Sequence, residues 1–238
     1  MTLAVVLVEP AGPLNVGSVA RLCANFDVDE LRLVAPRCDH LGEEARRMAV
    51  HGEALLERAR LFPNLEAALA DCRRVVATSG RIEEEALPLS GPAEALSWLQ
   101  GGSSPDAPAA LVFGREDRGL SNGELLQAGR ILRLDTSEAY ASMNLSHAVA
   151  VCLHELRRCP PAPADPQPEP CRRDQLEAAL ADAEELLLEV GFLYPHTAQA
   201  RLGKVRALLQ RAEIRDDEVA LLRGMVRQLR WASRRDCP

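Results

Sequence analysis

Short runs of Val, Leu and Ile recur along the first 158 residues, and stretches with a helical spacing of apolar positions separate them. Because the runs are brief and end at turn residues, they indicate buried strands. Strands are predicted at 3–8, 31–34, 74–78, 110–113 and 131–134, and helices at 15–26, 43–58, 64–71, 92–100, 121–128 and 144–157. This alternation predicts an α/β domain with a mostly parallel sheet and helices on both faces.

A proline-rich segment divides the chain. Residues 159–171 (CPPAPADPQPEPC) hold six Pro in thirteen positions, so they can form neither a helix interior nor a central strand. Residues 172–238 have a helical pattern almost throughout. We therefore expect a domain over 1–158, a linker over 159–171 and a small all-helical domain over 172–238.

Composition narrows the class of protein. The chain is 47% hydrophobic and 26% charged, which is typical of a globular protein. The early apolar run 3–8 is far shorter than a membrane span, so we expect a soluble protein without a signal peptide. Lys204 is the single lysine among the 28 basic residues and lies outside any Gly-Lys-Ser/Thr context, which argues against a P-loop ATPase and a pyridoxal enzyme.

Cysteine and histidine usage points to a cytoplasmic protein without a metal. The seven Cys are an odd number and include no Cys-x-x-Cys pair, so we expect reduced thiols. The five His include no His-Glu-x-x-His pattern, so we expect neither a structural nor a catalytic zinc site.

The last predicted helix carries a row of arginines beside an apolar seam. Residues 201–235 hold ten basic and four acidic residues, a local excess of six positive charges in a chain with a net charge of −7. The row is either a solvated helix face or a surface that contacts phosphates. Its members are Arg223, Arg227, Arg230 and Arg234, and the seam is Val219, Leu222, Val226 and Leu229.

Three polar patterns follow strands of the predicted sheet, where a parallel sheet binds ligands. In residues 15–21, Asn15 is a candidate N-cap, Gly17 allows close backbone approach and Arg21 could grip a phosphate. Residues 114–121 crowd four charges between two Gly and end at Ser121, which begins a Ser-x-x-Glu capping box with Glu124. Residues 142–150 begin a helix with Ser and Asn. Each pattern alone is an ordinary helix start.

Together, in this order, the three patterns resemble the TrmH-like branch of the SPOUT class of RNA 2'-O-methyltransferases. The first motif of that family matches Asn15, Gly17 and Arg21; the second matches 113–116 with 119–120; the third matches Ser142, Asn144 and Leu145. Within the branch the chain is most similar to the TrmJ subgroup, because of residues 191–193 and 221–224 in the helical extension.

The resemblance implies a fold, a cofactor and an assembly. It implies a trefoil knot around residues 110–155, S-adenosyl-L-methionine as the methyl donor, and a homodimer whose active site lies at the subunit interface. The absence of a Gly-x-Gly-x-x-Gly fingerprint fits this way of binding a cofactor. The positions that would line the cofactor pocket are Thr78, Ser79, Gly80, Gly114, Leu134, Met143, Asn144 and Leu145.

The resemblance also implies a reaction and a substrate. The TrmJ subgroup methylates the ribose at position 32 of the tRNA anticodon loop. Arg21 is the family's central catalytic residue, and because a guanidinium keeps its proton we expect it to stabilise the developing alkoxide and hold the adjacent phosphate. Asn15, Ser142 and Asn144 would complete the catalytic group, and Glu116 would fix Arg or backbone groups. Expected RNA contacts are Arg21, Arg81, Arg115, Arg223, Arg227 and Arg230.

One segment departs from this expectation, and other functions stay open. Glu83, Glu84 and Glu85 follow Arg81 where a tRNA-binding loop should be neutral or basic, so either RNA bypasses this loop or the substrate differs. The alternatives are the same chemistry on ribosomal RNA, or an RNA-binding or assembly protein with weak or no catalysis. A flavodoxin-like small-molecule domain would need all three motifs to be coincidental helix caps.

Overall fold

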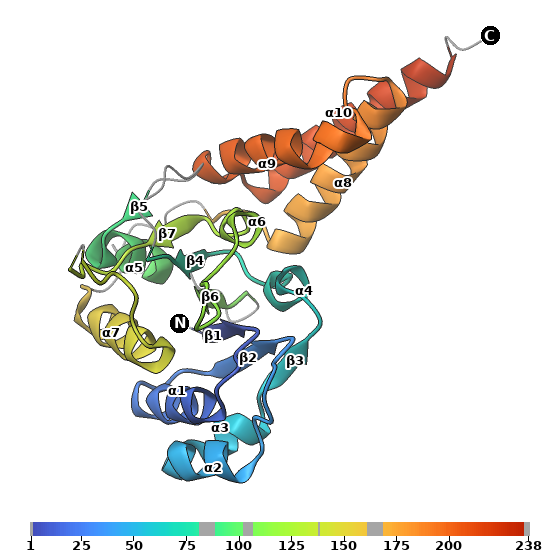
Figure 1. Cartoon of the computed structure of the whole chain (residues 1–238). Coiled ribbons are helices and arrows are strands. Elements are labelled where there is room, and N and C mark those ends of the chain that lie inside the picture. The colour runs from blue at the N-terminus through green and yellow to red at the C-terminus, as the bar shows by residue number, and fades with distance from the viewer. Residues whose placement is uncertain (1, 81–88, 102–106, 138, 161–168, 236–238) are drawn as a thin grey trace. The chain divides into compact units, whose positions relative to one another are not determined.

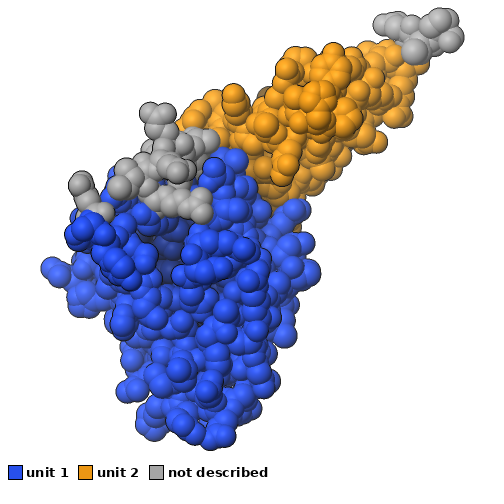
Figure 2. All heavy atoms as spheres, viewed as in Figure 1, with its two compact units in different colours: residues 1–167 blue, residues 168–238 orange. Residues whose placement is uncertain are grey.

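Figure 1 shows the computed structural model of the chain, which describes residues 2–80, 89–101, 107–137, 139–160 and 169–235. The chain forms two compact units, residues 1–167 and 168–238 (Figure 2). The division falls inside the proline-rich segment. Of that segment, residues 161–168 lie outside the described part.

A seven-stranded sheet forms the centre of the first unit (Figure 1). Its order is β3-β2-β1-β6-β4-β7-β5, and every neighbouring pair is parallel. The α/β prediction is therefore confirmed. The strands are β1 (Leu3–Val8), β2 (Glu30–Val34), β3 (Arg60–Phe62), β4 (Val75–Thr78), β5 (Leu89–Ser90), β6 (Ala109–Phe113) and β7 (Arg130–Leu132).

Helices cover both faces of the sheet because its central strands are apolar on both sides. All six residues of β1 and all five of β6 are buried. Alternate strand residues such as Val5 and Leu111 share one core cluster with residues of α1, α5 and α7, while α4 contacts the opposite face. The helices are α1 (Pro13–Asn25), α2 (Glu43–Ala49), α3 (Glu53–Glu57), α4 (Leu65–Leu69), α5 (Pro92–Gln100), α6 (Asn122–Leu125) and α7 (Leu145–Arg158).

Two predictions about the elements were incomplete. β3 and β5 were missed, because three and two residues are too short to show a period. The helix expected over 43–58 is broken by a 3-10 turn, η1 (Val50–Gly52), where Val50 has a φ of 50°. Gly52 explains the break: a Cβ there would lie 2.6 Å from the carbonyl oxygen of Ala20, so the turn packs directly on α1.

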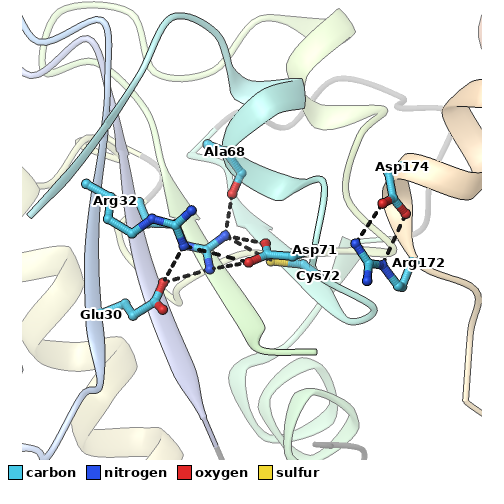
Figure 3. Close-up of polar contacts among 8 residues, drawn as sticks. Glu30, Arg32, Ala68, Asp71, Cys72, Arg172 and Asp174 are labelled. Carbon is cyan, nitrogen blue, oxygen red and sulfur yellow. Dashed lines mark hydrogen bonds and ion pairs between the residues drawn. The ribbon is translucent and has the colours of Figure 1, made fainter. Parts of the chain in front are cut away.

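An arginine is buried on the α4 side of the sheet (Figure 3). Arg32 on β2 is fully buried and donates to both carboxylate oxygens of Asp71 at 2.6 and 2.9 Å, to Glu30 at 2.8 Å and to the carbonyl of Ala68 at 2.6 Å. Burial alone would lower the pKa of Arg32, but these partners raise it above its ordinary value. The guanidinium therefore ties β2 to α4 without leaving a buried charge unpaired.

Over its described residues, 169–235, the second unit is three helices with small apolar cores. They are α8 (Arg173–Glu189), α9 (Pro195–Arg211) and α10 (Asp216–Arg235). Leu176, Leu180 and Val219 form one cluster between α8 and α10, and Leu193 and Leu202 belong to another beside α9. The helical prediction for this region is confirmed. In the part of the chain that the structure describes, no helix combines the length and apolar character needed to cross a membrane.

Candidate active site

A cavity of about 580 Å³ lies at the carboxyl ends of β4, β6 and β7. This is the edge of a parallel sheet where ligands bind. Its wall comes from residues 78–80, 113–120 and parts of 132–148. The structure therefore brings together most of the residues predicted to bind the cofactor, namely Thr78, Ser79, Gly80, Gly114, Leu134, Met143 and Leu145, and also Ser142. Asn144 is not part of the wall.

The loop after β6 folds back on its own first residue. A Cβ on Gly114 would lie 2.3 Å from the carbonyl carbon of Gly119, so only Gly fits there. Gly119 has a φ of 68°, which favours Gly, and its backbone pairs with that of Arg115 in both directions. Ser121 and Glu124 form the predicted capping box at α6. This part of the cavity wall is therefore a closed turn whose shape is set by contacts among residues 114–124.

Arg115 is held inside this turn by carboxylates. It donates to both oxygens of Glu124 at 2.9 Å and to Glu9, and its side chain is 10% exposed. These hydrogen bonds, to Glu124 first and then to Glu9, raise the pKa of the Arg115 guanidinium. Contact of Arg115 with RNA, one of the sequence predictions, gains no support because both terminal nitrogens of its guanidinium already donate to partners within the chain and its Nε is buried.

Glu9 is a residue of this site that lies at a strand end and to which the sequence assigned no role. It follows β1 with a φ of 45°, and its carboxylate contacts Arg115, Arg37 and Arg118. The hydrogen bond from Arg115 is the main cause that lowers the pKa of Glu9 to about 2, and the charge of Arg37 adds to it. The signal was present in the sequence as an acidic residue at a strand end, together with the two arginines of the charged turn 115–118.

Hydrogen bonds connect the three motifs beside the cavity. Glu116 accepts the backbone N–H groups of Ala11 and Gly12, both at 3.1 Å, and the side-chain amide of Asn15 at 3.2 Å. Asn144 in turn donates its amide to Asn15 at 3.1 Å. Burial raises the pKa of Glu116, but the hydrogen bonds outweigh it and the net shift is downward. The expectation that Glu116 fixes backbone groups is confirmed.

Of two expectations about α1, one was wrong and one is confirmed. Asn15 is not the N-cap, because Pro13 takes the first helical position and Gly12 the cap. Gly17 does permit a close backbone approach, and the neighbour is a helix. A Cβ on Gly17 would lie 2.1 Å from the carbonyl oxygen of Ala45 in α2.

Asn144 does cap its helix as expected. Its side-chain oxygen accepts the N–H groups of Ser146 at 3.0 Å and His147 at 3.3 Å at the start of α7. The same side chain therefore holds α7 with its oxygen and Asn15 with its nitrogen.

Arg21 stands apart from these groups. It is exposed and does not line the cavity, and among the described residues its side chain forms neither a hydrogen bond nor an ion pair. It follows Leu14 by seven residues, so the two share one face of α1, and Leu14 is 50% exposed. Asn15 lies on a different face. One copy of the chain thus does not bring Arg21 to the cavity.

The arginine row of α10 is largely neutralised by α8. Arg223 pairs with Asp182 at 2.9 Å, Arg230 with Glu185 at 2.9 Å and Arg234 with Glu189 at 3.1 Å. The predicted RNA contacts Arg223 and Arg230 are therefore engaged within the unit, and Arg227 is exposed. Arg81 and residues 83–85 lie outside the described residues. Within the described ranges, no group of three His, Cys, Asp or Glu side chains could hold a metal ion.

Comparisons with known proteins agree with this architecture. The sequence profile of the SpoU rRNA Methylase family matches residues 2–154, and that of the tRNA methyltransferase TrmJ C-terminal domain matches 174–237. The tRNA (cytidine/uridine-2'-O-)-methyltransferase TrmJ of Cronobacter sakazakii is 32% identical over 242 residues, with 98% of each chain covered.

Two solved structures extend the comparison. The crystal structure of TrmJ from Z. mobilis ZM4 is 29% identical, covers 96% of this chain and 99% of its own, and has a TM-score of 0.86. A structure described as giving insight into the 2-OH methylation of C/U34 on tRNA is 26% identical, covers 66% of this chain and 89% of its own, and has a TM-score of 0.52. The chain belongs to the SpoU rRNA Methylase family and, by its full-length similarity, to the TrmJ group within that family.

Proposed function

We propose that this protein transfers a methyl group from S-adenosyl-L-methionine to a ribose 2'-hydroxyl in the anticodon loop of tRNA. The observation that carries the proposal is the cavity at the sheet edge with the hydrogen-bonded side chains of Asn144, Asn15 and Glu116 beside it. The full-length relatives named as tRNA 2'-O-methyltransferases support the same reaction.

The cavity fits the methyl donor. Its volume of about 580 Å³ is in the range of cofactor sites. Apolar side chains such as Leu134 and Leu145 can cover an adenine ring, and the wall at Gly80 and Gly114 presents backbone groups directly, since neither residue has a side chain. When bound, S-adenosyl-L-methionine supplies an activated methyl group. The residues predicted to hold it are Thr78, Ser79, Gly80, Gly114, Leu134, Met143, Asn144 and Leu145.

The chain's own task is to align the 2'-oxygen and stabilise its charge. Ser142 lies in the cavity wall and Asn144 lies beside it, held by Asn15, so both can position the ribose. Arg21 would stabilise the alkoxide and hold the adjacent phosphate with its fork of donors. The proton leaves to that phosphate or to water, because the guanidinium is no base.

The exposed position of Arg21 supports an active site shared by two copies. Arg21 and the exposed Leu14 share one face of α1, away from their own cavity wall. A homodimer in which Arg21 of one copy faces the cavity of the other would complete the site.

The proposal also assigns a role to each part of the chain and a cellular compartment to the protein. Residues 1–158 would carry the chemistry in a knotted fold, the proline-rich segment 159–171 would be the linker, and residues 172–238 would bind tRNA. The six cysteines that the structure describes are free, which supports a reducing compartment such as the cytoplasm. No metal is required by the proposed chemistry.

Methyl transfer to defined RNA tests the proposal. Purified protein is incubated with methyl-labelled cofactor and unmodified tRNA or ribosomal RNA, and the labelled nucleotide is mapped by nuclease digestion and mass spectrometry. We expect a 2'-O-methylated nucleotide at position 32. Label at position 34, the position named for the structural neighbour, would correct the site and keep the reaction.

Other outcomes would change the function. Label only on ribosomal RNA would replace the substrate class. Absence of label on every RNA, together with RNA binding, would support the alternative of a catalytically weak RNA-binding protein.

A further inference from the structure

Helices α9 and α10 of the second unit differ in how many of their positive charges are paired with carboxylates. α10 carries five arginines, and three of them pair with Asp182, Glu185 and Glu189 of α8. α9 carries no Asp or Glu; its Arg206 pairs with Glu177 at 2.6 Å, whereas its Arg201 and Lys204 form no ion pair with a described residue. Thus most of the arginine row of α10 is compensated by α8, while α9 keeps two cations without a carboxylate partner among the described residues.

Arg201 and Lys204 lie on the exposed side of α9. Both are exposed, and among the described residues neither forms an ion pair. Leu208, seven residues after Arg201, is also exposed, so the three side chains share one face of the helix. Arg211 continues the same face one turn later.

Exposed aromatic rings stand at the start of this face. Phe192 is 61% exposed and Tyr194 is 54% exposed, in a chain with only eight Phe, Tyr and Trp residues. The guanidinium of Arg201 lies 5.8 Å from the centre of the Phe192 ring and donates to the Phe192 carbonyl at 3.1 Å. The Tyr194 ring stacks on His196 with 6.0 Å between centroids.

The turn between α8 and α9 fixes these rings in the exposed position. Gly191, with a φ of 75°, reverses the chain after α8, and the backbone N–H of Leu193 donates to Leu187 at 2.9 Å. Leu193, which lies between the two aromatic residues in the sequence, is buried and packs with Leu202. Large apolar rings held in solvent beside unpaired cations are typical of a surface that binds a ligand.

We propose that Phe192, Tyr194, Arg201 and Lys204, called here the α9 face, bind unstacked bases and phosphates of the tRNA substrate. Aromatic rings stack on bases of any sequence, and the flanking cations contact the phosphate backbone, which together suit the single-stranded part of an RNA. The inference deepens the proposed function, because it names the surface of the second unit that holds the tRNA. It replaces the arginine row of α10 as the expected contact.

Lys204 provides a direct test without any substitution, because it is the single lysine of the chain. The protein is treated with an amine-acylating reagent with and without unmodified tRNA, and the modification of Lys204 is followed by peptide mass spectrometry. A lysine-containing model peptide in the same reaction serves as the internal reference. We expect tRNA to slow the acylation of Lys204 at least about fivefold relative to the reference.

Substitutions test the same surface by affinity. The double variant Arg201→Gln/Lys204→Gln should bind tRNA about tenfold more weakly, and its salt dependence should fall by about 0.7 to 0.9 per lost phosphate contact. Phe192→Ala should also weaken binding about tenfold, through lost stacking. In each case KM for tRNA should rise while kcat at saturating tRNA stays the same, because the cavity is untouched.

The matched control is Arg47→Gln/Arg58→Gln, which removes the same charge from exposed positions of the first unit. It should bind tRNA within about twofold of the unaltered protein, by the usual size of surface effects. Equal acylation of Lys204 with and without tRNA would overturn the inference. A loss of tRNA affinity in Arg223→Gln/Arg227→Gln, without such a loss in Arg201→Gln/Lys204→Gln, would also overturn it. Protection of Lys204 that depends on protein concentration and not on tRNA would do the same, because it would indicate that a second copy of the chain covers this face.

The methyl-transfer assay separates this inference from the proposed function. If the protein methylates tRNA but the α9 variants bind it normally, only the inference fails. If the protein neither binds nor methylates tRNA, the proposed function fails and the inference fails with it.

Discussion

Two charged regions of the first unit behave in opposite ways. In the turn after β6, Arg115 is bound by Glu9 and Glu124, so its charge is used to hold the cavity wall. On the exposed face of α1, Arg21 has no partner among the described residues and does not reach the cavity of its own chain. The contrast teaches that a dense cluster of charges at a site can be structural. The isolated cation, Arg21, is the better candidate for a contact with the substrate.

The largest expected effect comes from Arg21. Arg21→Ala should lower kcat for methyl transfer by at least about 10²-fold, because a donor to the developing alkoxide is lost. Thermal unfolding should stay close to that of the unaltered protein, since no folded-state contact is removed. Arg21→Lys keeps the charge but loses the fork, so it should recover only part of the rate. Near-normal activity of Arg21→Lys would contradict a role for the fork.

A mixed dimer tests whether Arg21 acts on the cavity of its own chain or on that of a second copy. Arg21→Ala and Gly114→Val chains are co-expressed with different tags, and the mixed dimer is isolated. If Arg21 of one copy serves the cavity of the other, one of the two sites is intact and about half of the activity should return. If Arg21 serves its own chain, the mixed dimer should be inactive. Gly80→Val, whose Cβ would meet the Ala141 carbonyl oxygen at 3.4 Å, is the milder cavity variant if Gly114→Val does not fold.

A smaller effect is expected at Asn144, which is both a helix cap and a residue of the site. Asn144 and Asn64 are both N-caps, of α7 and α4, but only Asn144 also contacts Asn15. Each Asn→Ala variant should lose about 1 kcal/mol of unfolding free energy. Methyl transfer should fall about tenfold or more in Asn144→Ala and stay unchanged in Asn64→Ala, because both variants lose a cap but only Asn144 also has a role beside the cavity. Equal kinetic effects would reduce Asn144 to a structural cap.

The sequence predicted the parts of the site that depend on local pattern. The apolar run of β1, the glycines of 114–119 and the cap at Asn144 are each determined by neighbours a few residues away. The cavity could be located because parallel strands must end at one edge.

Other features depend on contact between distant segments, which a local pattern does not show. Arg223 and Arg230 are neutralised by acids of α8 some forty positions earlier, and a count of charges along one helix does not include them. The wrong N-cap was instead a local error: Asn15 was taken for a cap because Asn is a common one, although Pro13 already marks the first helical position. The role of Glu9 depends on Arg115, 106 residues later.

The smallest effect on catalysis is expected from Glu9, which contributes to the acid stability of the turn after β6. Because its arginine partners lower the pKa of Glu9 from 4.5 to about 2, the carboxylate stabilises the folded chain fully above pH 4.5. That contribution is lost as the pH falls from about 4.5 toward 2, where the folded chain also takes up the proton. Glu9→Gln should therefore cost about 2 kcal/mol of unfolding free energy near pH 7, the usual size for a hydrogen bond to a charged group.

The difference between the two proteins should shrink toward pH 2, and urea unfolding at a series of pH values measures it. The pKa values of Glu116 and Glu124 are lowered as well, so some acid sensitivity stays in Glu9→Gln. Glu43→Gln, an exposed carboxylate on α2, is the control and should leave the profile as it is. A Glu9→Gln profile parallel to that of the unaltered protein would show that the charge of Arg115 is held by Glu124 alone. The closed turn would then need only one of its two carboxylates.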